Sequence, residues 1–392
     1  MLNFNPKASL SFWETSSLLS CDYLIVGSGL VGLSAAAELK GKYPNANVKV
    51  LERGLLPTGA STKNAGFACF GSLTELLADL RQMSPEEALE LVEDRWEGLR
   101  LLRARVGDAA MDYEPLGGYE LFSEKELPAL EQLEAMNTML RDLFKTPVFE
   151  HLPQRSIAER CFSTQKFKAL VYNSLEGQLD TGQMMKTLLE IVLKLGVVIH
   201  TGAEVLQLEE TGQGVLVHTQ DLSNTRTLCF RASTVLVCTN GFSKRFNPDW
   251  DLAPGRGQVL ITEPIPNLAF RGAYHLEEGY FYFRNVQNRI LLGGGRHLAR
   301  EQERVTDLEV TDYLMGILET ILYEDILPQR QTSKPIIEHR WAGIMCFSEK
   351  TPTKKPILES LSKNVLAAIR LNGMGVAVGS RLAQRLVDMV TF

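Results

Sequence analysis

A glycine-rich turn near the start of the chain is the feature that most constrains its fold. Gly27-Ser28-Gly29-Leu30-Val31-Gly32 follows an apolar run of strand character and opens a helix rich in small residues, Leu30–Leu39. A turn at 43–47 then leads into a second short strand, Val48–Glu52. The sequence therefore predicts a β-α-β unit with the pattern G-x-G-x-x-G at its first crossover.

The glycines of this turn suit a dinucleotide. Gly27 allows the tight turn, Gly29 lets a pyrophosphate approach the backbone, and Gly32 lets helix and strand pack closely. The hexapeptide alone is a weak signal, but an acid, Glu52, follows Gly32 by 20 residues, where its carboxylate can hold a ribose hydroxyl. A carboxylate at this position repels the 2′-phosphate of NADP. The remaining candidate cofactors are FAD and NAD. The candidate cofactor-binding residues of this unit are Gly27, Ser28, Gly29, Val31, Gly32, Glu52 and the adjacent Arg53.

Composition excludes several other classes of protein. The chain has 392 residues, with 41 Lys and Arg against 47 Asp and Glu, a net charge of −6, and we expect two domains and no nucleic-acid partner. The longest uncharged stretch, 23–37, is too short to span a bilayer, and the N-terminus lacks the pattern of a secretion signal. We therefore expect a cytoplasmic protein without an integral membrane segment. The six cysteines form no C-x-x-C pair and have no histidine at ligand spacing, so no metal site is predicted.

The rest of the chain alternates between segments of helical periodicity and segments of strand-like sequence. Helical periodicity occupies Ser84–Arg105 and Gln183–Leu195, and the chain ends with a strand, Val365–Ile369, and a helix, Val376–Met389. Between residues 257 and 295 the sequence is aromatic and strand-like, which predicts an antiparallel sheet separate from the parallel one.

A loop of small residues after the second strand decides between the two cofactors. The loop Gly59-Ala-Ser-Thr-Lys-Asn-Ala-Gly-Phe67 resembles the G-A-S-x-x-N-x-G loop of the D-amino-acid oxidase, glycine oxidase and sarcosine oxidase family of FAD-dependent enzymes. In that family the loop runs past the FAD pyrophosphate to the flavin ring. The resemblance implies cofactor-binding roles for Ser61, Thr62, Lys63, Asn64, Ala65 and Gly66.

Further motifs extend the resemblance over most of the chain. Gly177–Asp180 is similar to the family's G-x-L-D-P segment, with Thr181 in place of the proline. Departures also occur near the C-terminus, where Thr353-Lys354-Lys355 replaces an acidic residue and a glycine before Pro356, which puts the substrate class in doubt. The remaining motifs imply cofactor-binding roles for Val205, which matches the strand that reads the adenine, and for Thr239, Asn240, Gly241, Gly373, Met374, Gly375 and Val376.

The resemblance implies an α/β protein of two domains. A discontinuous Rossmann-like FAD-binding domain of the glutathione-reductase type comprises 1–81, 177–243 and 349–392, and an antiparallel-sheet catalytic domain comprises 82–176 and 244–348. FAD is expected to be bound without a covalent tether. Cys346 lies in the segment where some relatives tether the flavin, but its apolar neighbours keep a thiol protonated and inert.

The activity expected from the resemblance is oxidation of a C–N bond in an amino acid or secondary amine, with hydride transfer to flavin N5 and oxygen or another compound as acceptor. The candidate catalytic residues are Arg296 and Arg340, as anchors for a substrate carboxylate, and Tyr282, on the wall of the cavity. Arg256 is a third possible anchor. The alternatives are oxidation of a 2-hydroxy acid, with His297 or His339 as base, and a non-catalytic module that keeps the dinucleotide for structure.

Overall fold

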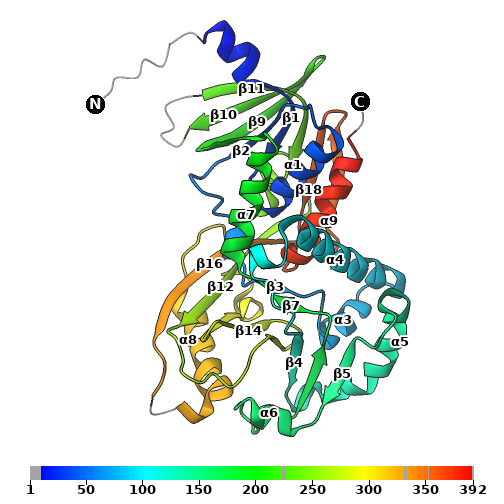
Figure 1. Cartoon of the computed structure of the whole chain (residues 1–392), viewed down its shortest axis with the longest axis vertical. Coiled ribbons are helices and arrows are strands. Elements are labelled where there is room, and N and C mark those ends of the chain that lie inside the picture. The colour runs from blue at the N-terminus through cyan, green and yellow to red at the C-terminus, as the bar shows by residue number, and fades with distance from the viewer. Residues whose placement is uncertain (1–9, 222–226, 331–332, 352, 391–392) are drawn as a thin grey trace.

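Two large β-sheets divide the molecule along its long axis, as the computed structural model in Figure 1 shows. The structure describes residues 10–221, 227–330, 333–351 and 353–390. Each large sheet has eight strands, and a small two-stranded sheet, β3 (Phe67–Ala68) with β7 (Gly177–Gln178), lies where the chain passes between them.

The first sheet contains the predicted β-α-β unit. Its strand order is β17-β18-β11-β1-β2-β8, and all neighbours in this row are parallel except β17 and β18. A hairpin, β9 and β10, continues antiparallel from β11. The bounds are β1 (Ser20–Val26), β2 (Val48–Glu52), β8 (Val198–Thr201), β9 (Ala203–Thr211), β10 (Gly214–Asp221), β11 (Thr227–Val237), β17 (Ile357–Ser362) and β18 (Val365–Ile369).

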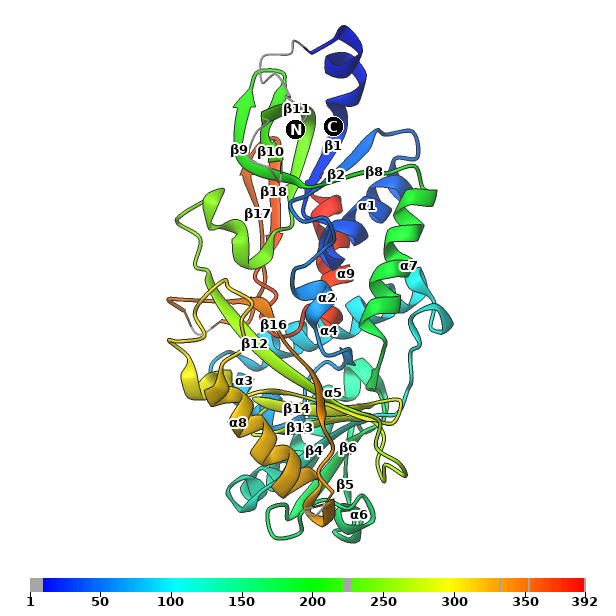
Figure 2. The ribbon, with the colours of Figure 1, turned by 90° about the vertical axis from the view of Figure 1, so that its left-hand side faces the viewer.

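Both faces of the parallel strands are buried, which explains their continuous apolar sequences. Tyr23 and Ile25 of β1 pack under helices, whereas Leu24 and Val26 pack on the opposite face against β9, β10 and β11. The helices on the first face are α1 (Leu30–Lys42), α7 (Thr181–Lys194) and α9 (Gly375–Asp388), with α4 (Pro85–Val106) packed against α9 (Figure 2).

The helix boundaries follow the capping residues of the sequence. Ser84 Oγ accepts a hydrogen bond from Glu87 N at 3.2 Å and the Glu87 carboxylate accepts one from Ser84 N at 3.2 Å, so α4 begins with a capping box. The α7 helix begins after Asp180, whose carboxylate accepts from Gln183 N at 2.8 Å.

The second sheet is mixed rather than purely antiparallel. Its order is β16-β12-β15-β14-β13-β4-β6-β5, and β13 pairs in parallel with β4, because these strands come from two segments distant in the sequence. The strands are β4 (Gly118–Phe122), β5 (Phe149–Leu152), β6 (Ala169–Asn173), β12 (Ala253–Thr262), β13 (Ala273–Leu276), β14 (Phe281–Val286), β15 (Arg289–Gly294) and β16 (Ile337–Phe347).

Short helices cover the second sheet and link it to the first. The helix α8 packs on one apolar cluster with β12 and β15, and α3, α4 and α5 pack on another with β4 and β6. The bounds are α2 (Ala60–Lys63), α3 (Leu73–Leu80), α5 (Leu133–Phe144), α6 (Arg155–Glu159) and α8 (Asp312–Thr320).

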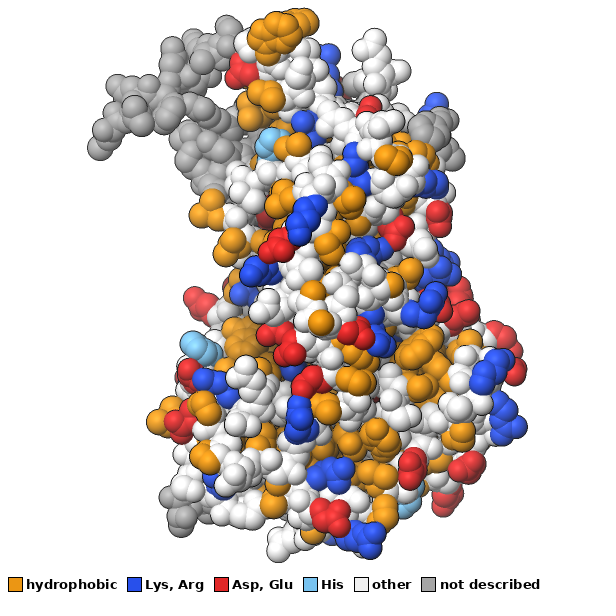
Figure 3. All heavy atoms as spheres, viewed as in Figure 1, with side chains coloured by type: hydrophobic (Ala, Val, Ile, Leu, Met, Phe, Trp, Pro, Cys, Tyr) orange, Lys and Arg blue, Asp and Glu red, His pale blue; other side chains and the backbone are white. Residues whose placement is uncertain are grey.

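The surface is evenly mixed in charge. On the face drawn in Figure 3, acidic and basic side chains are interspersed without a large patch of one sign. Within the described ranges, no helix combines the length and the apolar character that crossing a membrane requires.

Candidate active site

A cavity of about 500 Å³ lies between the two large sheets, within the usual size range of ligand sites. Its walls include the residues that follow β1, β2, β11 and β18, so the cavity lies at the carboxyl ends of parallel strands. Ligands of open α/β sheets bind at this edge. The opposite wall comes from β12, β14 and β16 of the second sheet.

The glycine-rich turn has the tight packing that its sequence predicts. Gly27 has φ +102°, and a Cβ on Gly32 would lie 2.0 Å from the Gly27 carbonyl oxygen. A Cβ on Gly29 would lie 3.0 Å from Ser61 Oγ, so Gly29 keeps the entrance to α1 open. Leu30 N, at the N-terminus of α1, donates to Ser61 Oγ at 2.8 Å. Gly27, Gly29 and Ser61 therefore form a backbone cradle that a phosphate group fits.

The carboxylate of Glu52 is held at the end of β2. Its Oε2 accepts from Ser28 N at 3.0 Å and from Ser28 Oγ at 2.8 Å, and its Oε1 accepts from Gly54 N at 3.0 Å. Glu52 lines the cavity, but Ser28 does not. Ser28 therefore positions the Glu52 carboxylate, and we expect it to act on the cofactor through Glu52.

The loop after α2 is fixed by hydrogen bonds from an unexpected partner. Asn64 Oδ1 accepts from Gly66 N at 2.9 Å and from the hydroxyl of Thr181 at 2.8 Å. Thr181 occupies the place of the proline in the family motif, so this substitution supplies a hydrogen bond to the loop. Thr62 lies outside the cavity, because its hydroxyl donates to the carbonyl of Pro57 at 2.6 Å.

A buried arginine that the sequence analysis did not single out supports the same loop. Arg284, on β14, donates through Nε to the carbonyl of Ala65 and through Nη2 to that of Leu179 at 3.0 Å. Burial lowers the pKa of Arg284 to about 10. No local sequence pattern indicates this role of Arg284, because residues 65, 179 and 284 come together only in the folded chain.

The cavity brings together most of the predicted cofactor-binding residues. Gly32 is the remaining exception besides Ser28 and Thr62, because it packs α1 against the turn and does not face the cavity. The predicted residues on the wall are Gly27, Gly29, Val31, Glu52, Arg53, Ser61, Lys63, Asn64, Ala65, Gly66, Val205, Thr239, Asn240, Gly241, Gly373, Met374, Gly375 and Val376.

Comparison with known proteins agrees with this geometry. Residues 22–389 match the model of the FAD-dependent oxidoreductase family. The chain belongs to this family. The family resemblance and the α/β fold class expected from the motifs are confirmed.

Individual relatives are distant in sequence. The oxidoreductase is 24% identical to gamma-glutamylputrescine oxidoreductase from Escherichia coli (strain K12) over 383 residues, covering 94% of this chain and 83% of the relative. It superposes on L-proline dehydrogenase from P. horikoshii with a TM-score of 0.74 at 16% identity, over 95% of this chain and 93% of the other. It superposes on glycine oxidase from Geobacillus kaustophilus with a TM-score of 0.73 at 18% identity, over 95% of this chain and 96% of the other.

The three candidate arginines of the oxidoreductase have different surroundings. Arg256 is buried in ion pairs with Glu303 and Asp307. Arg340 is exposed, donates to Glu319 at 2.7 Å and does not line the cavity, so its position does not favour the predicted role as a substrate anchor.

Arg296 is the candidate on the cavity wall. Its guanidinium stacks over the ring of Phe347 at 3.9 Å, and no ion pair to it occurs among the described residues. Burial lowers the pKa of Arg296, with the nearby Arg300 acting in the same direction. A partly desolvated cation without a carboxylate partner suits an anionic group on a ligand.

Side chains at the start of β14 and just before it alternate between the cavity and the core. Tyr282 and Tyr280 both line the cavity, whereas Phe281 and Phe283 pack into the core of the second sheet. Tyr282 contacts Phe67 edge-to-face at 5.4 Å, and burial raises the pKa of Tyr282 to about 12. Its phenol is therefore neutral at physiological pH.

The two histidines considered as bases do not line the cavity. His297 contacts Tyr280, with ring centroids 4.3 Å apart, and His339 is exposed on β16. A different histidine, His275 on β13, lines the cavity, and burial lowers its pKa against the opposing charge of Glu75. No motif marked His275, because it lies in a strand of ordinary apolar pattern.

His275 also completes a cluster that sequence spacing did not predict. Ligand atoms of Cys69, Glu176 and His275 lie within 4.8 Å of one another, although the residues come from three segments. Glu176 Oε1 accepts from Phe70 N at 2.8 Å and Gly71 N at 3.0 Å. Burial raises the pKa of Glu176 to about 7, and burial raises the pKa of Cys69 well above its usual value, so the thiol is protonated at neutral pH.

Proposed function

We propose that the chain binds FAD in the cavity between the sheets and oxidises a C–N bond of an amino acid or secondary amine. The observation that carries this proposal is that Gly27 and Asn64, from the N-terminal segment, and Gly375, from the C-terminal segment, line one cavity at the carboxyl ends of parallel strands. The family of the chain and the names of its relatives support the same class of reaction.

The residues present fit an FAD molecule. Glu52 would hold the ribose, the Gly27–Gly29 backbone and the N-terminus of α1 the pyrophosphate, and Val205 the adenine end. The N-terminus of α9, which begins at Gly375, would stabilise negative charge on the reduced ring. When bound, FAD supplies the acceptor for a hydride from the carbon next to the substrate nitrogen.

The protein's own contribution is then positioning. Arg296 would bind a substrate carboxylate, and Tyr282 would form an apolar wall that excludes water from the reacting carbon. Oxidation of a 2-hydroxy acid gains no support from His297 or His339, because both lie outside the cavity. Substrate oxidation would leave an imine, which water hydrolyses.

The domain division inferred from the sequence fits this assignment. The proposed FAD-binding segments, 1–81, 177–243 and 349–392, supply every strand of the first sheet. The proposed catalytic segments, 82–176 and 244–348, supply every strand of the second.

The test is to purify the chain from flavin-replete cells and heat it. We expect a yellow protein that releases FAD, and an absorbance that amines or amino acids bleach without oxygen. A colourless preparation would exclude the proposal. Bleaching by hydroxy acids but not by amines would select the other chemistry, and bleaching by dithionite alone would indicate a structural cofactor.

A further inference from the structure

Four charged side chains gather at the end of the cavity formed by α3 and α4. Asp79 and Arg95 are almost completely buried, with 2% and 1% of their side chains exposed, while Glu75 is 13% and Lys354 31% exposed. Glu75, Arg95 and Lys354 line the cavity, and Asp79 lies behind them. Burying charged side chains costs free energy unless the charges are paired. The four side chains of this cluster therefore depend on one another for their placement at the cavity.

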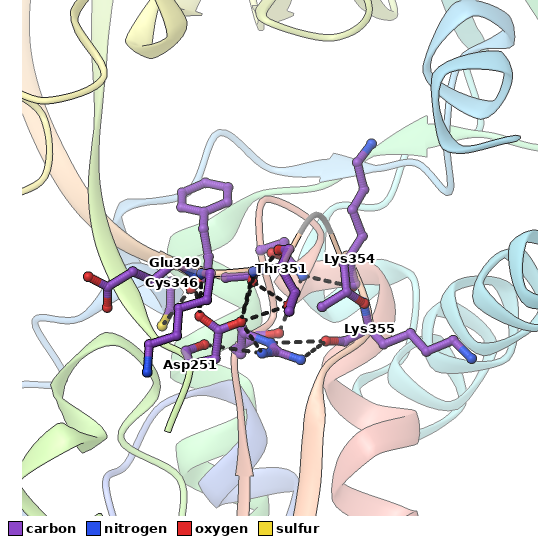
Figure 4. A network of polar contacts seen from close by, with 12 residues as sticks. Asp251, Cys346, Glu349, Thr351, Lys354 and Lys355 are labelled. Carbon is purple, nitrogen blue, oxygen red and sulfur yellow. Dashed lines mark hydrogen bonds and ion pairs between the residues drawn. The ribbon is translucent and has the colours of Figure 1, made fainter. Parts of the chain in front are cut away.

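Lys354 reaches the cavity because its loop is anchored from below (Figure 4). Asp251 accepts from Glu349 N and Lys350 N, both at 2.7 Å, and fixes the start of the loop. Asn372 Nδ2 donates to the carbonyl of Lys354 at 2.7 Å. The neighbouring Lys355 points away and pairs at the surface with Glu87 and Glu90 on α4. The departure from the family motif at 353–355 therefore places one lysine at the cavity and one outside it.

The charges within the cluster are unevenly distributed. Lys354 Nζ lies 2.5 Å from Asp79 Oδ1 but 3.6 Å from Glu75 Oε1, which is longer than a hydrogen bond. Arg95 also faces Asp79, at 3.8 Å, and donates to the carbonyl of Phe70 at 2.9 Å. Both cations therefore lie near Asp79, Lys354 is shared between Asp79 and Glu75, and Lys354 is the single ion-pair partner of Glu75 in the described part of the chain.

Glu75 is the acid of this cluster that is directed to the cavity. Burial alone would raise the pKa of Glu75, but the charges of Lys354, Arg95 and His275 outweigh burial and lower it. Glu75 Oε2 also lies 3.5 Å from the position that a Cβ on Gly279 would take. Gly279 and the adjacent Tyr280 also line the cavity, as do Glu75 and Arg296.

We propose that Glu75 binds a second, cationic group of the substrate, an ammonium or guanidinium, where α3 and α4 line the cavity. This inference rests on the proposed function and names its substrate class: an amino acid or amine with an additional basic group. A cation there would donate charge-assisted hydrogen bonds to Glu75, whose Oε1 lies 3.6 Å from Lys354 Nζ, beyond hydrogen-bond distance. A neutral substrate chain of the same length would displace water from Glu75 without replacing the hydrogen bonds of that water. Such a substrate would therefore bind more weakly than the cationic one.

The test compares pairs of compounds of equal length in the wild type: lysine with 2-aminoheptanoic acid, and arginine with citrulline, each as both enantiomers, and putrescine with pentylamine. The efficiency of anaerobic flavin bleaching should favour the cationic member of a pair about ten- to a hundredfold. Glu75→Gln should remove at least a tenfold part of that preference, mainly through weaker binding. Glu90→Gln, the same change on the surface of α4, should leave the preference unchanged.

Two results would overturn the role of Glu75 and leave the proposed function intact: equal bleaching by both members of every pair, or a preference that persists in Glu75→Gln. If Glu75→Gln loses its flavin, Glu75→Asp decides, because the retained charge should preserve the cationic preference with weaker binding. Absence of bleaching by every compound would contradict the proposed function, and the Glu75 subsite with it.

Discussion

Arg296 differs from the other candidate arginines in having no carboxylate partner among the described residues. We predict that Arg296→Ala lowers kcat/KM for a substrate with a carboxylate by about 1.5–3 kcal/mol, or roughly 10- to 150-fold, because a charge-assisted contact is lost. Arg340→Ala is the matched control, since its side chain bonds Glu319 at the surface. Steady-state kinetics unchanged in Arg296→Ala would refute the anchor.

The thiol of Cys346 bears on how the flavin is held. Cys346 has no exposed surface, lies outside the cavity and packs in the core of the first sheet, and burial raises its pKa to about 12. A protonated thiol directed away from the cavity cannot attack a flavin. Acid precipitation should therefore leave a colourless pellet and a yellow supernatant. Yellow colour that stays in the pellet, and disappears in Cys346→Ser, would contradict this prediction.

Residue-level reasoning from the sequence succeeded where the constraint is local. Gly27, Gly29 and Glu52 are separated by few residues and by one strand and one helix, so their spacing alone predicts where they meet. Arg284 and Lys354 could not be predicted in the same way. Their partners, Ala65 and Asp79, are more than two hundred residues distant, and ordinary strand and loop sequences surround them.

At the scale of the element, the packing of α1 on β1 depends on Gly32. A Cβ at Gly32 would lie 2.0 Å from the Gly27 carbonyl oxygen, so Gly32→Ala must push the helix away from the turn. We expect a loss of about 1–3 kcal/mol in unfolding free energy and a lower flavin content.

Gly41, in the last turn of the same helix, provides the matched control. A Cβ there would meet nothing within 4 Å, so Gly41→Ala should stabilise the protein by about 0.5–1 kcal/mol through helix propensity. Denaturant unfolding and flavin absorbance measure both variants. Equal stability and equal flavin content in the two variants would show that close packing at Gly32 is unimportant.

The elements of the first sheet were more predictable than those of the second. Short parallel strands and capped helices carry their signals within ten or twenty residues, as at Ser84 and Asp180. The parallel pairing of β13 with β4 joins segments more than 150 residues apart, and no local pattern specifies it. The sequence therefore predicted a separate second sheet but not its mixed character.

At the scale of the whole molecule, two buried acids hold the segment that crosses between the sheets. Glu120 accepts from the hydroxyl of Ser72 at 2.9 Å and from Thr74 N at 3.1 Å, and Glu176 accepts from Phe70 N and Gly71 N. Burial raises the pKa of both acids from 4.5 to about 7, against the opposing effect of these hydrogen bonds. The folded protein therefore keeps protons that the unfolded chain releases.

This difference predicts how stability depends on pH. The two acids stabilise the fold most below pH 4.5, and their contribution decreases as the pH rises towards about 7. The decrease is at most about 1.4 kcal/mol per pH unit for each group. Glu176→Gln, which cannot ionise, should flatten the slope of unfolding free energy between pH 5 and 7. An unchanged slope would show that Glu176 titrates normally.

The account as a whole depends on amine oxidation by FAD in the cavity between the sheets. The most direct measurement is an anaerobic single turnover of the purified flavoprotein with an excess of a bleaching amine or amino acid, followed by quantification of the carbonyl product. We predict one equivalent of product for each flavin bleached, and recovery of the yellow colour with oxygen or an added acceptor. Failure of every amine and amino acid to bleach a flavin that dithionite reduces would contradict the account.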